Sequence, residues 1–310
     1  MSEVSKPAIH SAAPLSAKSS SVRKPAKKPL GLPWNERNAK FSPFKTAVLV
    51  GVALPGLAVI FAMLTDDLGA RPVNEVIHRL GLWVIRLLLI SLAITPLRQI
   101  FNWPRLVVVR RMVGVAAFVY LALHFGAYIV DEAFDLSKVV SEIVNRLYLT
   151  IGFVALAILA ALAATSTDGM VRRLGGRHWQ NLHRLVYLAA LLGSIHYFLQ
   201  SKLNVYEPTV MAGLFIWMMG YRAIGWLSSF RRAAGLPSLL ALAIGATLIT
   251  GLGEALYYQL ARNIDFMRVL SLDWSLIGGV RPALVVLIGT LVVALSKPAV
   301  DYVQHKLRRR

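Results

Sequence analysis

Eight apolar segments, each close to the length that a helix needs to cross a lipid bilayer, dominate this sequence. A helix needs about 20 mostly apolar residues to span the hydrocarbon core, and hydrophobic residues make up 56% of the 310 residues. No ordinary soluble domain is so apolar over such a length. The sequence therefore predicts an all-α, polytopic transmembrane helical bundle. The predicted spans cover residues 46–64, 79–97, 112–131, 148–164, 183–200, 209–227, 238–257 and 283–297.

The basic residues fall mainly in the tails and in alternate loops. Lysine and arginine concentrate on the cytoplasmic side of membrane proteins, so this pattern predicts that both termini are cytoplasmic, which requires an even number of spans. The loop at 258–282 fits the pattern less well. Membrane topology explains the formal charge of +19 better than nucleic-acid binding does, and we expect no nucleic-acid partner. Residues 1–44 are predicted to form a disordered basic cytoplasmic tail that has affinity for the lipid bilayer surface.

Three histidines, His124, His183 and His196, lie inside or at the mouth of the apolar segments. An ionisable side chain in a bilayer is costly and suggests a functional site, and imidazole is a favoured axial ligand of haem iron. The chain has no cysteine, which excludes thiolate-held iron–sulfur clusters, disulfides and covalently attached haem. The histidines therefore suggest b-type haem that is held by coordination alone.

Counting residues along the spans predicts the depth of each histidine. His196 follows His183 by 13 residues, or roughly 20 Å along a helix axis. His124 follows Arg110 and Arg111 by a similar number, and both spans run outward, so His124 and His196 are expected to pair at one depth. His183 is expected near the cytoplasmic face, where the two arginines are candidate partners for haem propionates. The alternative is that the histidines only form hydrogen bonds between helices.

Two further residues are candidates for the same site. Arg86 lies in the middle of the second span and needs an anionic or polar partner, such as a haem propionate, a quinone carbonyl or another helix. His78 begins that span and is a tentative outer-face site. The chain has no glycine-rich nucleotide motif that follows a strand and no P-loop. The electron donor is therefore expected to be a membrane quinol or a separate flavoprotein.

Several motifs, spread over successive spans in matching order, resemble the MsrQ (YedZ) family within the ferric-reductase-like transmembrane group. The resemblance covers about residues 45–230. The motifs are Gly69-Ala70-x-Pro72-Val73, Ile94-Thr95-Pro96-Leu97, Arg110-Arg111-Met112-Val113-Gly114 through Leu123-His124, Trp179-Gln180-x-Leu182-His183 and Ile195-His196-Tyr197. The resemblance implies a six-helix haem-binding core at 45–232. Residues 233–310 add two further transmembrane helices and a basic cytoplasmic tail that the resemblance does not cover.

The resemblance also implies cofactors, partners and roles. It implies one or two b-type haems and bound FMN, with electrons drawn from the quinone pool of the bacterial inner membrane. The electrons would pass to MsrP, a periplasmic molybdenum-containing subunit that reduces methionine sulfoxide in proteins. The family's ligand histidines match His124, His183 and His196, and Arg86 falls where the family carries a basic residue. No motif assigns the flavin site, and a cytoplasmic flavin reductase is a further candidate partner.

We therefore expect an electron-transfer subunit whose substrate-reducing site lies on a partner protein. Two other classes remain open from the sequence. One is a transmembrane metal reductase or another cytochrome b on a similar scaffold. The other is a non-redox membrane scaffold or transporter in which the histidines are structural.

Overall fold

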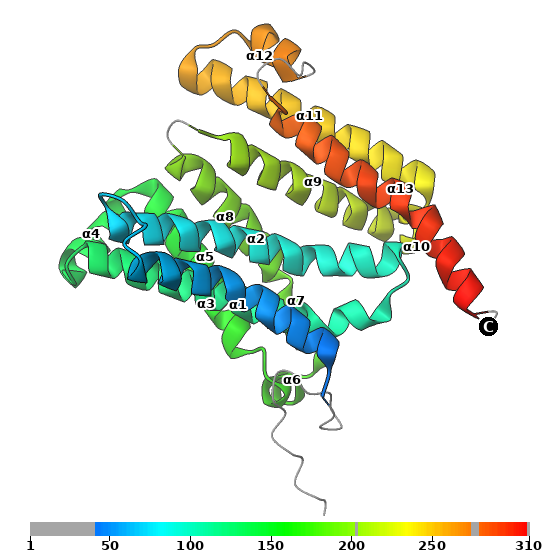
Figure 1. Ribbon diagram of the computed structural model, residues 1–310, viewed down its shortest axis with the longest axis horizontal. Coiled ribbons are helices and arrows are strands. Elements are labelled where there is room, and N and C mark those ends of the chain that lie inside the picture. Colours follow the sequence, from blue (N-terminus) through cyan, green and yellow to red (C-terminus); the bar gives the residue numbers. More distant parts are fainter. Residues whose placement is uncertain (1–40, 202–203, 274–278, 309–310) are drawn as a thin grey trace, which may run out of the picture.

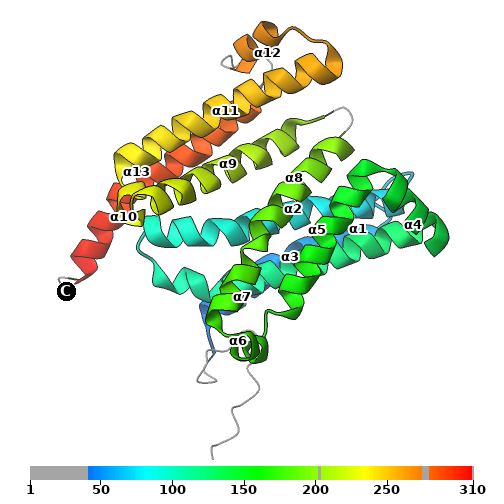
Figure 2. The same ribbon diagram turned by 180° about the vertical axis from the view of Figure 1, so that it is seen from behind.

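The computed structural model describes residues 41–201, 204–273 and 279–308, which form helices joined by turns (Figures 1 and 2). Within these residues, eight helical spans are long and apolar enough to cross a membrane, which confirms the predicted bundle. The spans contain α1 (Pro43–Leu64), α2 (Pro72–Ile100), α3 (Val107–Asp131), α5 (Leu147–Ala164), α7 with α8 (Gly176–His183, Leu185–Gln200), α9 (Tyr206–Leu227), α11 (Leu236–Arg262) and α13 (Pro282–Arg308). Shorter elements are η1 (Pro104–Leu106), α4 (Leu136–Asn145), α6 (Asp168–Leu174), α10 (Phe230–Ala233) and α12 (Phe266–Asp273). The predicted basic tail lies almost wholly outside the described residues.

Large apolar side chains cover the outside of the bundle. On α1, Leu57 and Phe61 are 57% and 67% exposed, and on α3 Leu123 is 54% exposed. A soluble protein rarely exposes contiguous apolar patches of this kind, whereas lipid tails solvate them. The chain is therefore a multi-pass membrane protein.

Residue chemistry accounts for several helix ends. Proline occupies the first turn of α1, α2 and α11. A backbone N–H has no acceptor within the helix at this position, so proline breaks no helical hydrogen bond there. The Asp135 carboxylate accepts a hydrogen bond from the Lys138 N–H at the start of α4. Thr167 caps α6 in the same way through the Met170 N–H. At the other end of α11, Asn263 adopts a left-handed conformation with φ of 53°, which is a frequent helix stop.

The helices associate as pairs around α2. Helix α2 packs along α3, and α5 packs along α8. Helix α9 lies between this group and the α11–α13 pair, which stacks on the side away from α3 and α5 (Figures 1 and 2). Figure 1 also shows the start of α1 and the end of α13 at the same end of the bundle. This agrees with an even number of spans. The candidate site therefore lies between two faces of the bundle, at which α2, α3, α5 and α8 begin and end.

The C-terminal helix is longer than the sequence predicts. The predicted span stops at residue 297, whereas α13 continues through Pro298 to Arg308. Near its end, the Gln304 side-chain amide donates a hydrogen bond of 2.7 Å to the Phe101 carbonyl, at the C-terminal end of α2. Tertiary contact with the six-helix part of the chain therefore supports the extra turns.

The α11–α13 pair joins α9 through small residues. A Cβ atom on Gly213 of α9 would lie 2.4 Å from Thr250 Oγ1 on α11 and 2.6 Å from Val286 Cγ2 on α13. Small residues let transmembrane helices approach closely. Glu254 of α11 is buried at 3% exposure and pairs with Arg281, the residue before α13, at 3.1 Å. The first contact fixes the added pair to α9, and the second joins α11 to the start of α13.

Gly213→Ala is expected to destabilise this three-helix junction. The new methyl group would overlap side chains of both α11 and α13, and overpacking of this kind costs about 1–3 kcal/mol. The measurement is equilibrium unfolding of the purified protein in detergent micelles. Gly245→Ala in α11 is the matched control, because its added Cβ meets nothing within 4 Å. Equal stability of the two variants would contradict the close packing.

Candidate functional site

His124 and His196 share one mode of hydrogen bonding to a neighbouring helix. Nδ1 of His124, on α3, lies 2.8 Å from the Ile77 carbonyl oxygen of α2. Nδ1 of His196, on α8, lies 2.7 Å from the Tyr148 carbonyl oxygen of α5. A carbonyl oxygen only accepts, so each Nδ1 carries a proton and donates it, which leaves the Nε2 lone pair of a neutral ring available. Within the described residues, no hydrogen bond reaches either Nε2.

The two imidazoles lie toward the same end of the bundle. Ile77 stands in the second turn of α2 and Tyr148 in the first turn of α5, and both helices begin at that end. The arrangement therefore presents two neutral imidazole nitrogens, from the helix pairs α2–α3 and α5–α8, toward one end of the bundle.

The donor set fits a metal held by a macrocycle better than a bare ion. The described part of the chain contains no group of three or more histidine, cysteine, aspartate or glutamate side chains that could hold a metal ion. A porphyrin supplies four equatorial ligands of its own, so two axial imidazoles are enough. Hydrogen bonds from Nδ1 to backbone carbonyls are also the usual way in which ligand histidines are oriented. The residues present therefore fit haem b.

His183 lies apart from this pair, at the end of α7. Its ring stacks on Trp179 at 3.8 Å between centroids, and its Nδ1 donates to the Trp179 carbonyl at 3.1 Å. Nε2 lies 3.3 Å from the Ser166 hydroxyl, but that hydroxyl makes a shorter bond of 2.7 Å to the Leu162 carbonyl. The contact between the Ser166 hydroxyl and His183 Nε2 is therefore weaker than the bond of that hydroxyl to the Leu162 carbonyl. The assignment of His183 as an iron ligand stays a prediction.

The structure also locates the other residues that the sequence analysis named as candidates for the site. Arg110 and Arg111 lie within electrostatic range of His183, as their predicted depth requires. Arg111 pairs with Asp168 of α6 at 2.5 Å. His78 is exposed on α2, and its Nδ1 bonds to the Asn74 carbonyl of its own helix at 2.8 Å.

Arg86 has a carboxylate partner that sequence reasoning missed. Its Nη2 donates to Glu207 Oε1 of α9 at 2.9 Å, and its guanidinium lies 5.1 Å from the centre of the Trp83 ring. The other Glu207 oxygen accepts a 2.9 Å hydrogen bond from the Tyr197 hydroxyl, next to His196. A chain of three polar groups therefore links α2, α9 and the helix of a candidate ligand. Arg86 and Glu207 are 121 positions apart in the sequence, so no local pattern predicts that they pair.

Arg222 is a second buried cation that the sequence did not single out. It lies near the C-terminal end of α9, yet it is only 2% exposed. Its Nη2 donates to the Leu92 carbonyl of α2 at 2.6 Å and its Nη1 to the Met218 carbonyl at 2.9 Å. The guanidinium also lies 5.3 Å from the centre of the Tyr187 ring. Arg222 therefore ties α9 to α2 and α8.

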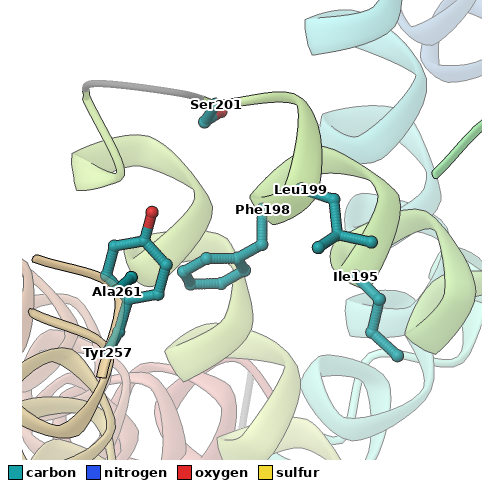
Figure 3. A pocket seen from close by; sticks show the side chains of 6 residues that line it. All are labelled: Ile195, Phe198, Leu199, Ser201, Tyr257 and Ala261. Carbon is teal, nitrogen blue, oxygen red and sulfur yellow. The ribbon is translucent and has the colours of Figure 1, made fainter. Parts of the chain in front are cut away.

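An apolar groove of about 440 Å³ adjoins the His196 helix (Figure 3). The rings of Phe198 on α8 and Tyr257 on α11 lie together there, with centroids 6.0 Å apart. Ile195 and Leu199, also on α8, extend the lining. This lining suits an apolar ring or chain rather than a polar solute.

The fold and this site define a multi-pass helical membrane protein with paired intramembrane histidines. Residues 80–194 match a protein-family model described as "Ferric reductase like transmembrane component". That match includes His124 and His183 and ends two residues before His196. A comparison with solved structures finds no match.

Curated relatives carry one name, protein-methionine-sulfoxide reductase heme-binding subunit MsrQ. The protein from Rhodospirillum rubrum is 43% identical over 195 residues, which are 63% of this chain and 93% of that protein. The Herminiimonas arsenicoxydans protein is 38% identical over 59% of this chain and 84% of its own length. The Xanthomonas campestris protein is 44% identical over 55% and 78%. The chain belongs to the MsrQ family, and the resemblance found in the sequence is confirmed.

Proposed function

We propose that this protein is a haem b electron-transport subunit that supports repair of methionine sulfoxide in proteins. One observation carries the proposal: His124 and His196 reach from two helix pairs toward the same end of the bundle, each with Nδ1 bound to a carbonyl and Nε2 free. Their Nε2 atoms are proposed as the axial ligands of one haem iron. The relatives are named as a heme-binding subunit, which supports this assignment.

The absorption spectrum of the purified protein tests the proposal. We expect a Soret band and, after reduction with dithionite, the sharp bands of a six-coordinate, low-spin haem. Extraction with acidified acetone is expected to release the haem, because the chain has no cysteine to attach it. A colourless protein, after expression with added haem precursor, would overturn the proposal and favour a scaffold or transporter.

The proposed direction of electron flow is from the cytoplasmic side or the membrane toward the outer face. Bound haem supplies one-electron transfer, and the chain supplies the ligands and the surroundings of the iron. With the basic loops on the cytoplasmic side of a bacterial inner membrane, both termini are cytoplasmic and the His124–His196 pair lies toward the outside. A periplasmic MsrP subunit is the proposed acceptor, and His78 lies exposed on that side.

We propose membrane quinol and bound FMN as the electron donors. A cytoplasmic flavin reductase would be a further partner, which supplies electrons to the FMN. The apolar groove at Phe198 and Tyr257 supports a quinol contact near His196, because a quinone ring and its tail need such a lining. Arg86, Arg110 and Arg111 remain proposed contacts of haem propionates or quinone oxygens. Their guanidinium groups suit carboxylates, and a second haem at His183 would lie within electrostatic range of the last two.

A further inference from the structure

Each of the two paired histidines rests against a glycine of the helix that accepts its hydrogen bond. A Cβ atom on Gly81 of α2 would lie 3.1 Å from both Nδ1 and Cε1 of His124. A Cβ atom on Gly152 of α5 would lie 2.8 Å from Nδ1 and 2.9 Å from Cε1 of His196. Both separations are tighter than ordinary van der Waals contact, so neither ring could keep its place against an alanine.

The two glycines occupy the same position relative to the accepting carbonyl. Ile77 and Gly81 are four residues apart, and so are Tyr148 and Gly152. In an α-helix the Cα–Cβ bond tilts toward the N-terminus, so a side chain covers the turn that precedes it. A Cβ at either glycine would therefore cover the carbonyl four residues earlier. Its absence opens a notch through which Nδ1 reaches that oxygen.

The same spacing recurs once more where no ligand is involved. The Tyr120 hydroxyl of α3 donates to the Val52 carbonyl of α1 at 2.8 Å. A Cβ on Gly56, four residues after Val52, would lie 3.0 Å from that hydroxyl oxygen. A carbonyl followed by glycine four residues later thus admits a polar side chain from α3 or α8 into the groove of a neighbouring helix.

We propose that Gly81 and Gly152 are positioning residues for the axial ligands of the haem, one for each histidine. This inference rests on the proposed haem site. Each notch lets a backbone carbonyl hold the Nδ1 proton, which fixes the tautomer and the ring plane and keeps Nε2 free for iron. The alternative is that the glycines only allow the helices to pack closely. That alternative does not require the closest atoms at both glycines to be those of a histidine ring.

The proposal predicts that the two glycine variants weaken haem binding to different degrees. Loss of an outer-shell hydrogen bond to a ligand typically costs about 10–100-fold in metal affinity, and Gly152→Ala is expected to weaken haem binding by that factor. Gly81→Ala is expected to have a smaller effect, because its contacts of 3.1 Å are less close. Both variants are expected to shift the midpoint potential and to perturb the low-spin electron paramagnetic resonance signal, since both report on ligand orientation.

Two control variants separate ligand positioning from packing. Gly126→Ala adds a methyl to α3 two residues from His124, where nothing lies within 4 Å, and it is expected to leave haem unchanged. Gly56→Ala introduces a clash of the same kind against Tyr120, and it is expected to lower thermal stability while the haem potential stays within the range of the unaltered protein.

The experiment measures haem affinity by transfer to apomyoglobin, together with the potential, for the full-length protein in detergent. Gly152→Ala and Gly81→Ala variants that match Gly126→Ala in both readouts would overturn the notch proposal. If Gly152→Ala does not accumulate, the milder Gly81→Ala decides. His196→Ala is measured in parallel: if it loses haem while both glycine variants keep it, only the notch is wrong, and if it keeps haem, the haem site itself is wrong.

Discussion

Alanine in place of His124 or His196 is expected to remove nearly all haem from the purified protein. Each histidine is the proposed source of one axial bond, and even outer-shell changes cost about 10–100-fold in metal affinity. The apoprotein is expected to stay folded. The Ile77 and Tyr148 carbonyls lie inside α2 and α5, so their own helices still provide a hydrogen-bond donor after the ring is gone. The measurement is the ratio of Soret absorbance to protein absorbance.

A matched control and a chemical rescue sharpen this test. His78→Ala removes an exposed histidine of α2 whose ring bonds within its own helix, and it is expected to retain haem. In a His196→Gly variant the space left beside Gly152 is open to added imidazole, which is expected to restore part of the Soret band. Full haem content in either His124→Ala or His196→Ala would remove the ligand assignment.

The number of spans was predictable because bilayer thickness fixes the length of an apolar helix. The depth of the histidines followed from counting residues along helices that run in one direction. The hydrogen bonds that hold the rings were not predictable, since a carbonyl acceptor such as that of Ile77 or Tyr148 carries no residue-type signal. The glycines were visible in the sequence, but their role depends on which helix α3 or α8 lies against.

Pairing of charges across the bundle was the least predictable part of the site. Arg86 was singled out because a mid-span arginine needs a partner. Glu207 lies in the first turn of α9, where it looked like a loop acid. Arg222 lies near the C-terminal end of α9, and the packing of α9 against α2 and α8 buries it. Local sequence gives the cost of such a charge, whereas the fold decides what offsets it.

Neutralising Glu207 is expected to destabilise the protein more than any surface change would. Glu207→Gln leaves the Arg86 guanidinium, 30% exposed, without its carboxylate among apolar helices. Breaking a buried pair costs about 3–5 kcal/mol, and an exposed pair is worth about 0–1 kcal/mol. Glu207 is 42% exposed, so the loss lies between these two limits. We therefore expect the free energy of unfolding in detergent to fall by about 1–2 kcal/mol.

The double variant Arg86→Met with Glu207→Gln distinguishes the pair's contribution to stability from a role for Arg86 in haem binding. Removing both charges is expected to restore much of the stability, because no uncompensated cation remains, and the Tyr197 hydroxyl still has an amide oxygen to donate to. If the double variant is no more stable than Glu207→Gln, the ion pair does not account for the loss. Haem content then tests whether Arg86 has a role in haem binding. If Arg86 also binds a propionate, haem affinity falls in the double variant but not in Glu207→Gln, because only the first of these lacks the guanidinium.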